Sequence, residues 1–351
     1  MAVTSQKVGV ALKIFFVIAL SVYFLIFNVE RPRILVLHSY ALDYNWTQQV
    51  NEGLMRVFKG RTDFSLHWQY MDTKNHPSVS FKQKSGILAR RMIARLRPQI
   101  IIAVDDDAQD FAAKFYVDNP EIKIIFAGVN GELRDYNYEN VDNVTGVLER
   151  LPLAAVKDTV PFLLKSAKDP NDIKIINLGD TSGTVRRDEK HILAFDWSPL
   201  NLIDSVLVGD FEDWKSAIIE ASKRADCLFI TNYRQIRRTA SGDASFVPAK
   251  ELIAWTLENS SVPILGGNGF VVEDGASIAI SASAYEQGEV AARLALKVLA
   301  GTPPHELAVT STQHFLVSVR GNLSEKFPRL PQIYEAFARG TGKMYDSKPR
   351  E

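Results

Sequence analysis

From Arg33 onward, the sequence alternates short, uninterrupted apolar runs with longer stretches in which apolar residues recur every three or four positions. Uninterrupted runs of four to eight residues are typical of strands buried on both faces, and the longer period is typical of amphipathic helices. The first half of the chain predicts strands at 34–37, 66–71, 100–104 and 122–129, and helices at 46–59, 81–96 and 105–117. Such alternation favours a parallel sheet covered by helices on both faces.

The same pattern starts again after about residue 150. The second half predicts strands at 173–178, 202–208, 227–230 and 262–265, and helices at 153–164, 185–195, 213–223, 249–257 and 285–299. Two α/β halves therefore follow one another, with a boundary near 143–153. A length of 351 residues suits two lobes of ordinary size.

A long apolar run precedes the first predicted strand. Residues 8–29 contain a single charged residue, Lys13, and a membrane-spanning helix needs about 20 residues. The run is either an uncleaved anchor or a cleaved signal peptide. The small-x-small sequence from Ala19 to Ser21 lies in the middle of the run, where a cleavage site is not expected. We therefore favour an uncleaved membrane anchor.

Composition and motifs narrow the function. Basic and acidic residues balance at 41 each, which argues against a nucleic-acid partner. The single cysteine, Cys227, cannot form an internal disulfide, and the six histidines lack metal-ligand spacing. Nucleophile elbows, zinc-protease motifs and dinucleotide fingerprints are absent from the sequence. We expect a protein that is not an enzyme and that uses neither a metal nor a cofactor.

Ligands of open parallel sheets bind beyond the carboxyl ends of the strands, so the residues that follow each predicted strand are candidates for contact. After the first strand, Ser39, Tyr40, Tyr44 and Trp46 combine small polar groups with aromatic rings. Such a loop can stack against a flat ligand and bind its polar edge. The alternative is that Tyr44 and Trp46 pack the start of the next helix.

Acidic and amide side chains follow two further strands. Asp105, Asp106 and Asp107 come directly after the strand at 100–104, and Asn130 follows the strand at 122–129. An aspartate at a helix N-terminus commonly caps free backbone N–H groups, and this is our first interpretation. Asp105 or Asp106 facing a cleft would instead accept a hydrogen bond from a ligand.

The second half offers a loop rich in hydroxyl groups. Thr181, Ser182 and Thr184 lie between a strand and a helix, where backbone N–H groups can hold an anion. Asn232 and Asn268 follow the next two strands of this half. Together these side chains predict a polar ring around a small ligand.

Several motifs, in order, resemble those of one family. They are Ile34–Tyr40 with Trp46–Thr47, Met71–Lys74, Ile100–Asp107, Phe126–Asn130, Thr145–Val147 and Val262–Leu265. The chain is similar to ABC-transporter substrate-binding proteins of the tryptophan/tyrosine-type group, over about residues 33–325. The resemblance implies the two-lobed type I periplasmic-binding fold, an α/β fold in which three crossover segments join the lobes and the ligand closes between them.

The resemblance also implies a division of the chain. We predict an anchor at 1–31, a first lobe from 32–148 plus about 282–308, a second lobe from 149–281 plus about 309–335, and a polar tail at 336–351. The expected function is capture of a small solute, an amino acid or another ring-bearing molecule, on the periplasmic side of the bacterial inner membrane. The partner is an ABC permease. The alternative is a sensor that signals to a separate membrane protein such as a histidine kinase.

Overall fold

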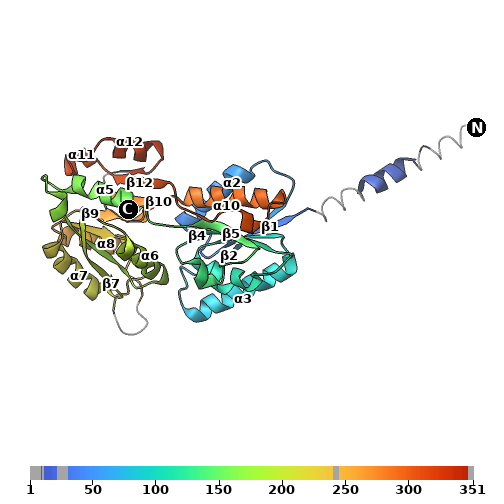
Figure 1. Cartoon of the computed structure of the whole chain (residues 1–351), viewed down its shortest axis with the longest axis horizontal. Coiled ribbons are helices and arrows are strands. Elements are labelled where there is room, and N and C mark those ends of the chain that lie inside the picture. Colours follow the sequence, from blue (N-terminus) through green and yellow to red (C-terminus); the bar gives the residue numbers. More distant parts are fainter. Residues whose placement is uncertain (1–8, 10–11, 22–30, 240–244, 347–351) are drawn as a thin grey trace, which may run out of the picture.

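The computed structural model describes residue 9 and residues 12–21, 31–239 and 245–346. Two α/β lobes lie side by side, and the N-terminal segment extends away from one of them (Figure 1). Each lobe contains one sheet with helices on both faces. We call the lobe that begins at Arg33 the first lobe and the other the second lobe.

The sheet of the first lobe has the strand order β11-β5-β4-β3-β1-β2, and its neighbouring strands are all parallel. Its strands are β1 (Arg33–His38), β2 (Ser65–Tyr70), β3 (Ile100–Val104), β4 (Lys123–Val129), β5 (Val144–Leu148) and β11 (Thr310–Ser311). In β1, Ile34 and Val36 pack on one side of the sheet while Leu35 and Leu37 pack on the other. Burial on both faces explains why these strands are continuous apolar runs.

Helices α2 (Asn45–Phe58) and α10 (Ala284–Leu299) cover one face of this sheet. They approach closely because Gly53 and Gly288 present no side chain at the crossing, where an added Cβ would collide with the backbone of the facing helix. The other face is covered by α3 (Val79–Leu96), α4 (Asp106–Phe111) and two 3-10 helices, η1 (Ala113–Tyr116) and η2 (Leu133–Tyr136).

The sheet of the second lobe has the order β13-β12-β10-β9-β8-β6-β7. Its strands are β6 (Lys174–Asp180), β7 (Asn201–Val208), β8 (Cys227–Ile230), β9 (Ile264–Gly266), β10 (Ile278–Ala282), β12 (Phe315–Arg320) and β13 (Met344–Tyr345). Strand β12 pairs antiparallel with β10, and the other pairings are parallel. The prediction of a mostly parallel sheet is therefore confirmed for both lobes.

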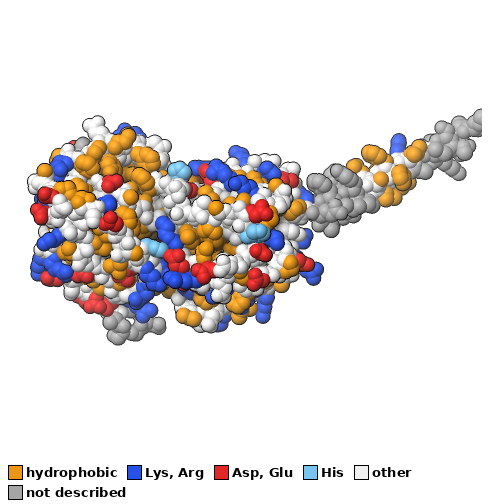
Figure 2. Space-filling view, in the orientation of Figure 1, with side chains coloured by type: hydrophobic (Ala, Val, Ile, Leu, Met, Phe, Trp, Pro, Cys, Tyr) orange, Lys and Arg blue, Asp and Glu red, His pale blue; other side chains and the backbone are white. Residues whose placement is uncertain are grey.

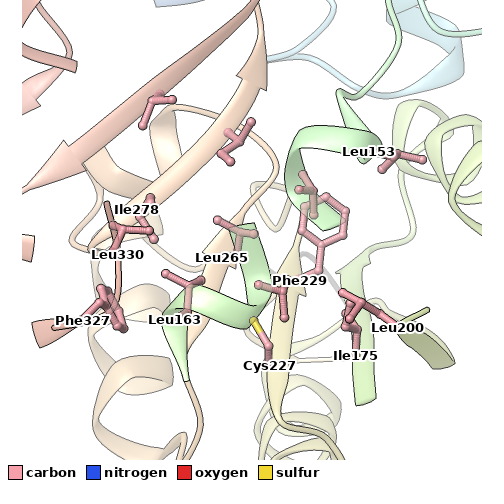
Figure 3. Close-up of a cluster of buried hydrophobic side chains, with 14 of the residues drawn as sticks. Leu153, Leu163, Ile175, Leu200, Cys227, Phe229, Leu265, Ile278, Phe327 and Leu330 are labelled. Atoms are coloured by element: carbon pink, nitrogen blue, oxygen red, sulfur yellow. The ribbon is translucent and has the colours of Figure 1, made fainter. Parts of the chain in front are cut away.

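Two buried clusters hold the second lobe together. Figure 3 shows one of them, in which Cys227 and Phe229 of β8 belong to the same cluster as Leu163 and Leu265. Burial raises the pKa of the Cys227 thiol to about 12, so the side chain is a small hydrophobic residue of the core. The helices of this lobe are α5 (Leu153–Leu163), α6 (Gly183–Ala194), α7 (Phe211–Arg224), α8 (Ala249–Asn259), α9 (Phe270–Glu273), α11 (Leu323–Lys326) and α12 (Ile333–Gly340), with the 3-10 helix η3 (Pro170–Asp172).

Three described segments cross between the lobes: β5 to α5, β10 to α10 and β11 to β12. Near the first lobe, the 3-10 helix η4 (Pro304–Glu306) lies between α10 and β11. The buried amide of Gln287, on α10, accepts from the Gly128 N–H at 2.8 Å and donates to the Thr312 hydroxyl at 3.1 Å. That hydroxyl also accepts from the backbone N–H of Arg150 at 3.0 Å. One glutamine on α10 therefore ties two of the crossing segments together.

The structure differs from the sequence prediction at one helix and in the C-terminal tail, and it describes only part of the predicted anchor. The single helix expected at 105–117 is divided into α4 and η1, because the backbone departs from helical geometry at Ala112 (φ −138°). Part of the predicted polar tail at 336–351 is regular structure, since α12 buries Ala338 and β13 extends the sheet. Most of the predicted anchor lies outside the described residues. Residues 12–21 are helical, and the described chain includes no helix long and apolar enough to cross a membrane.

Candidate functional site

A cavity of about 300 Å³ lies between the two lobes, at the carboxyl ends of strands from both sheets. Eight of the residues predicted to contact a ligand line it: Tyr40, Tyr44, Trp46, Asp105, Asn130, Thr184, Asn232 and Asn268. Residues that follow different strands, far apart in the sequence, therefore meet at one place, as expected for the carboxyl ends of parallel strands. Which of them contact a ligand remains a prediction.

Aromatic rings form one side of the cavity. The rings of Tyr40 and Tyr44 meet edge to face, with their centroids 5.3 Å apart. The ammonium group of Lys74 lies 5.2 Å from the centroid of the Tyr40 ring. Trp46, in the first turn of α2, donates from its indole N–H to Asp105 at 2.9 Å. The segment after β1 thus places three rings, and the loop after β2 places a cation, near the carboxyl group that follows β3.

Asp105 is a component of the cavity wall and not a helix cap. Its backbone has φ 65°, in the left-handed region, and its side chain makes no capping bond to α4. Oδ1 accepts from Trp46, whereas Oδ2 is buried and has no partner among the described residues. Burial, and then the charge of Asp106, raise the pKa of Asp105 well above its usual range, although Lys74 opposes the shift. A buried carboxyl oxygen without a partner is costly and is a natural contact for a ligand donor.

Two further carboxyl groups of the cavity were missed in the sequence. Glu149 follows β5, and burial raises its pKa well above its usual range, with Asp188 adding to the effect. Asp188 lies on α6, where burial raises its pKa to about 7 although the Asn130 amide donates to it at 3.0 Å. Glu149 directly follows a strand, which was a usable signal. Asp188 lies within a helix, where an aspartate ordinarily faces solvent.

The cavity also contains cations that the sequence analysis did not select. Burial acts to lower the pKa of Lys74, but Tyr44, Asp180 and Asp105 outweigh it, so the net shift is upward. Arg234 binds Asp274 at 2.9 Å, and its guanidinium lies 4.5 Å from the centroid of the Phe270 ring. Its Nε is buried without a partner among the described residues. Lys74 belongs to the Met71–Lys74 motif, so the sequence carried a signal for it.

Four predicted residues lie outside the cavity wall. The hydroxyl of Ser39 donates to the Val104 carbonyl and accepts from the Ala108 N–H, so it joins β1 to α4. Asp106 is buried, accepts from the Tyr136 hydroxyl, and accepts from the Gly131 N–H at 3.0 Å. Thr181 is exposed, and Ser182 is buried behind the wall.

The lobes contact each other beside the cavity. Arg187, on α6 of the second lobe, lies 3.2 Å from Asp110 and 3.8 Å from Asp106, both of the first lobe. Asn45 donates to Glu273 of the second lobe at 2.5 Å. The space-filling view shows the two lobes in contact (Figure 2). Hydrogen bonds and ion pairs between the two lobes are lost when the lobes separate, so these contacts favour the closed arrangement of the lobes.

Two lobes, three crossing segments and a polar cavity between the lobes are the features of the periplasmic-binding fold. The chain belongs to the ABC transporter substrate-binding protein family, whose model matches residues 82–323. That family consists of extracytoplasmic binding proteins and not of enzymes. This chain is accordingly a substrate-binding protein for a small ligand.

Solved structures show the same fold at low sequence identity. A conserved domain protein from Vibrio cholerae has a TM-score of 0.61 at 13% identity, over 91% of this chain and all of its own. A domain from Streptococcus pneumoniae in complex with L-Trp has a TM-score of 0.60 at 13% identity, over 87% of this chain and 98% of its own. A ligand-free, open substrate-binding protein with adhesive properties from Clostridium difficile has a TM-score of 0.58 at 13% identity, over 91% of this chain and all of its own. A search of curated proteins found no match.

Proposed function

We propose that this chain captures an amino acid with a ring-bearing side chain between its lobes and delivers it to an ABC permease. We further propose that it does so on the periplasmic face of the inner membrane, held there by the apolar run at residues 8–29. Tyr40, Tyr44 and Trp46 stack against the ring. The polar groups of the cavity hold the charged end of the ligand.

The observation that carries the proposal is the pairing of acids and bases around one small cavity. Asp105, Glu149 and Asp188 provide carboxyl groups, and Lys74 and Arg234 provide cations. A zwitterion satisfies both kinds of group, since its ammonium group donates to carboxylates and its carboxylate accepts from cations. A neutral sugar offers hydrogen bonds but no charge to either the carboxyl groups or the cations of the cavity. The L-Trp complex of the Streptococcus pneumoniae domain supports a ligand of this class.

Binding to a series of related ligands tests the proposal. The full chain, purified in detergent, is titrated calorimetrically with L-tryptophan, tryptamine, indole-3-propionate and glucose. We expect L-tryptophan to bind at least tenfold more tightly than either compound that lacks one charged group, because each loss leaves a buried partner unpaired. Glucose is expected not to bind. Equal affinity for all three indoles, or binding of glucose alone, would contradict the proposal.

The sensing alternative uses the same cavity and differs in the partner. It is favoured by the apolar N-terminal run, because a protein held at the membrane remains beside a membrane receptor. Uptake of labelled ligand by cells with and without the gene distinguishes the two. Lost uptake supports transport, whereas unchanged uptake with a lost transcriptional response supports sensing.

A further inference from the structure

The outward face of α3 combines exposed apolar side chains with basic side chains. Residues three or four positions apart share one face of a helix, which places Lys84, Ile87, Leu88, Arg91 and Arg95 together. All five are exposed, with 42% exposure at Ile87 and 57% at Leu88. The opposite face packs into the core through Ala89 and Ile93. Two large aliphatic side chains therefore lie exposed on the same helix face as three basic side chains.

The charge of α3 is of one sign. Its 18 residues include no aspartate or glutamate, although acidic and basic residues balance over the whole chain. Lys82 pairs with Asp107 at 2.8 Å, and Arg90 donates to the Phe111 carbonyl. Lys84, Arg91 and Arg95 have no ion-pair partner among the described residues. The unpaired charges therefore lie on the same face as Ile87 and Leu88.

The end of α3 lies beside the start of the first lobe. The guanidinium of Arg33 donates to the carbonyl of Arg97, the C-cap residue of α3, at 3.1 and 3.2 Å. Arg33 comes four residues after the apolar run at 8–29. Figure 1 places α3 along one edge of the first lobe, and Figure 2 shows basic and apolar side chains mixed along that edge.

We propose that this face of α3 docks on an anionic phospholipid bilayer. Basic residues near an anionic membrane each strengthen binding by about fivefold, and exposed aliphatic side chains insert at the boundary between headgroups and acyl chains. The face made by Lys84, Ile87, Leu88, Arg91 and Arg95 supplies both contributions. Docking would hold the first lobe against the bilayer and leave the second lobe free to move. This inference does not depend on the identity of the bound solute.

A fluorescent probe on the helix tests the inference. Leu88→Cys is labelled with an environment-sensitive dye in the full chain, under native conditions in which the buried Cys227 stays unreactive. The labelled chain is placed in lipid discs of phosphatidylcholine alone or with about 30% phosphatidylglycerol. We expect a blue-shifted emission in the discs that contain phosphatidylglycerol and no shift in those of pure phosphatidylcholine. We also expect it to be lost at about 1 M salt, where the Debye length falls to about 3 Å.

Two matched controls make the result decisive. The same dye at Leu193 on α6, which is 59% exposed, should report no difference between the discs. Neutralising Lys84, Arg91 and Arg95 to glutamine should weaken docking by roughly 100-fold and abolish the shift. The same change to glutamine of Lys215, Lys223 and Arg224 on α7 should leave the emission shift unchanged. Identical emission in neutral and anionic discs, or a shift that survives the α3 neutralisation, would overturn the inference.

Discussion

The indole N–H of Trp46 donates to Oδ1 of Asp105 at 2.9 Å and thereby joins the first turn of α2 to the end of β3. The other oxygen of Asp105 is buried and has no partner among the described residues. Trp46 therefore fixes the orientation of a carboxyl group whose remaining oxygen is available to a ligand. This contact makes Trp46 a positioning residue as well as a candidate for stacking.

Substitutions of Trp46 separate these two roles. Trp46→Phe keeps an aromatic face but removes the donor to Asp105, whereas Trp46→Ala removes both. We expect Trp46→Ala to weaken ligand binding by more than tenfold and Trp46→Phe to weaken it by less, because stacking contributes beyond the single hydrogen bond. Calorimetric titration of both variants measures the difference. Wild-type affinity in a correctly folded Trp46→Ala protein would exclude stacking.

Lys74 provides a second test, because it is expected to bind the ligand carboxylate. Lys74→Met keeps most of the side-chain volume and removes the charge. We expect L-tryptophan to bind at least tenfold more weakly, while tryptamine, which has no carboxylate, loses little affinity.

The matched control for Lys74→Met is Lys84→Met, which removes a lysine from the exposed face of α3. It should leave both affinities unchanged. Equal losses for both ligands in Lys74→Met would show that Lys74 acts on the cavity as a whole and not on the carboxylate.

The contact between Arg187 and Asp110 predicts an effect on closure and not on selectivity. The two groups lie 3.2 Å apart across the lobes, and neither lines the cavity. A partly exposed ion pair contributes up to about 1 kcal/mol, so Arg187→Gln should weaken binding by about fivefold. The factor should be the same for strong and weak ligands, because only the population of the closed state changes.

A double-mutant cycle with Asp110→Asn measures the coupling between these two residues. Arg186→Gln is the matched control, since Arg186 bonds only to the Thr181 carbonyl of its own lobe among the contacts described. Additive effects of the two substitutions, or a changed order of ligand preference in Arg187→Gln, would contradict a role in closure.

Most of the fold could be predicted because its strands are buried on both faces. Runs such as Ile100–Val104 and Cys227–Ile230 have few other interpretations, and both occur as strands with those bounds. Elements that depend on tertiary pairing were not predictable in this way. Strand β13 has two residues and exists because β12 offers a free edge. The helix expected at 105–117 is divided where the backbone leaves helical geometry at Ala112, although alanine itself favours a helix.

The site was predictable where chemistry follows a strand and was missed where it does not. Tyr40, Asp105, Asn130 and Asn232 follow strands and line the cavity. Asp188 lies in α6, and only the approach of the second lobe to Asn130 turns an ordinary helical aspartate into a buried one. Burial of this kind is a property of two lobes together and leaves no local pattern.

The buried Asp188 predicts how stability depends on pH. Its pKa is raised to about 7 by burial, whereas an aspartate in the unfolded chain has a pKa of about 3.9. Between these values the folded state holds a proton that the unfolded state does not, so the free energy of unfolding falls as pH rises through this window. The contribution of this one group is about 4 kcal/mol at 1.36 kcal/mol per pKa unit.

Asp188→Asn removes the titrating group and keeps an oxygen that accepts from Asn130. We therefore expect the ligand-free variant to resemble the wild type near pH 4 and to be more stable at pH 8. Denaturant unfolding at both pH values measures the difference. Subtracting the values of the two proteins removes the contribution of Asp105, whereas the change includes a part from Glu149, which has the same sign because Asp188 raises its pKa. The exposed Asp158→Asn, on α5, should follow the wild-type pH dependence. If Asp188→Asn also follows the wild type from pH 4 to pH 8, Asp188 does not retain its proton in the folded state.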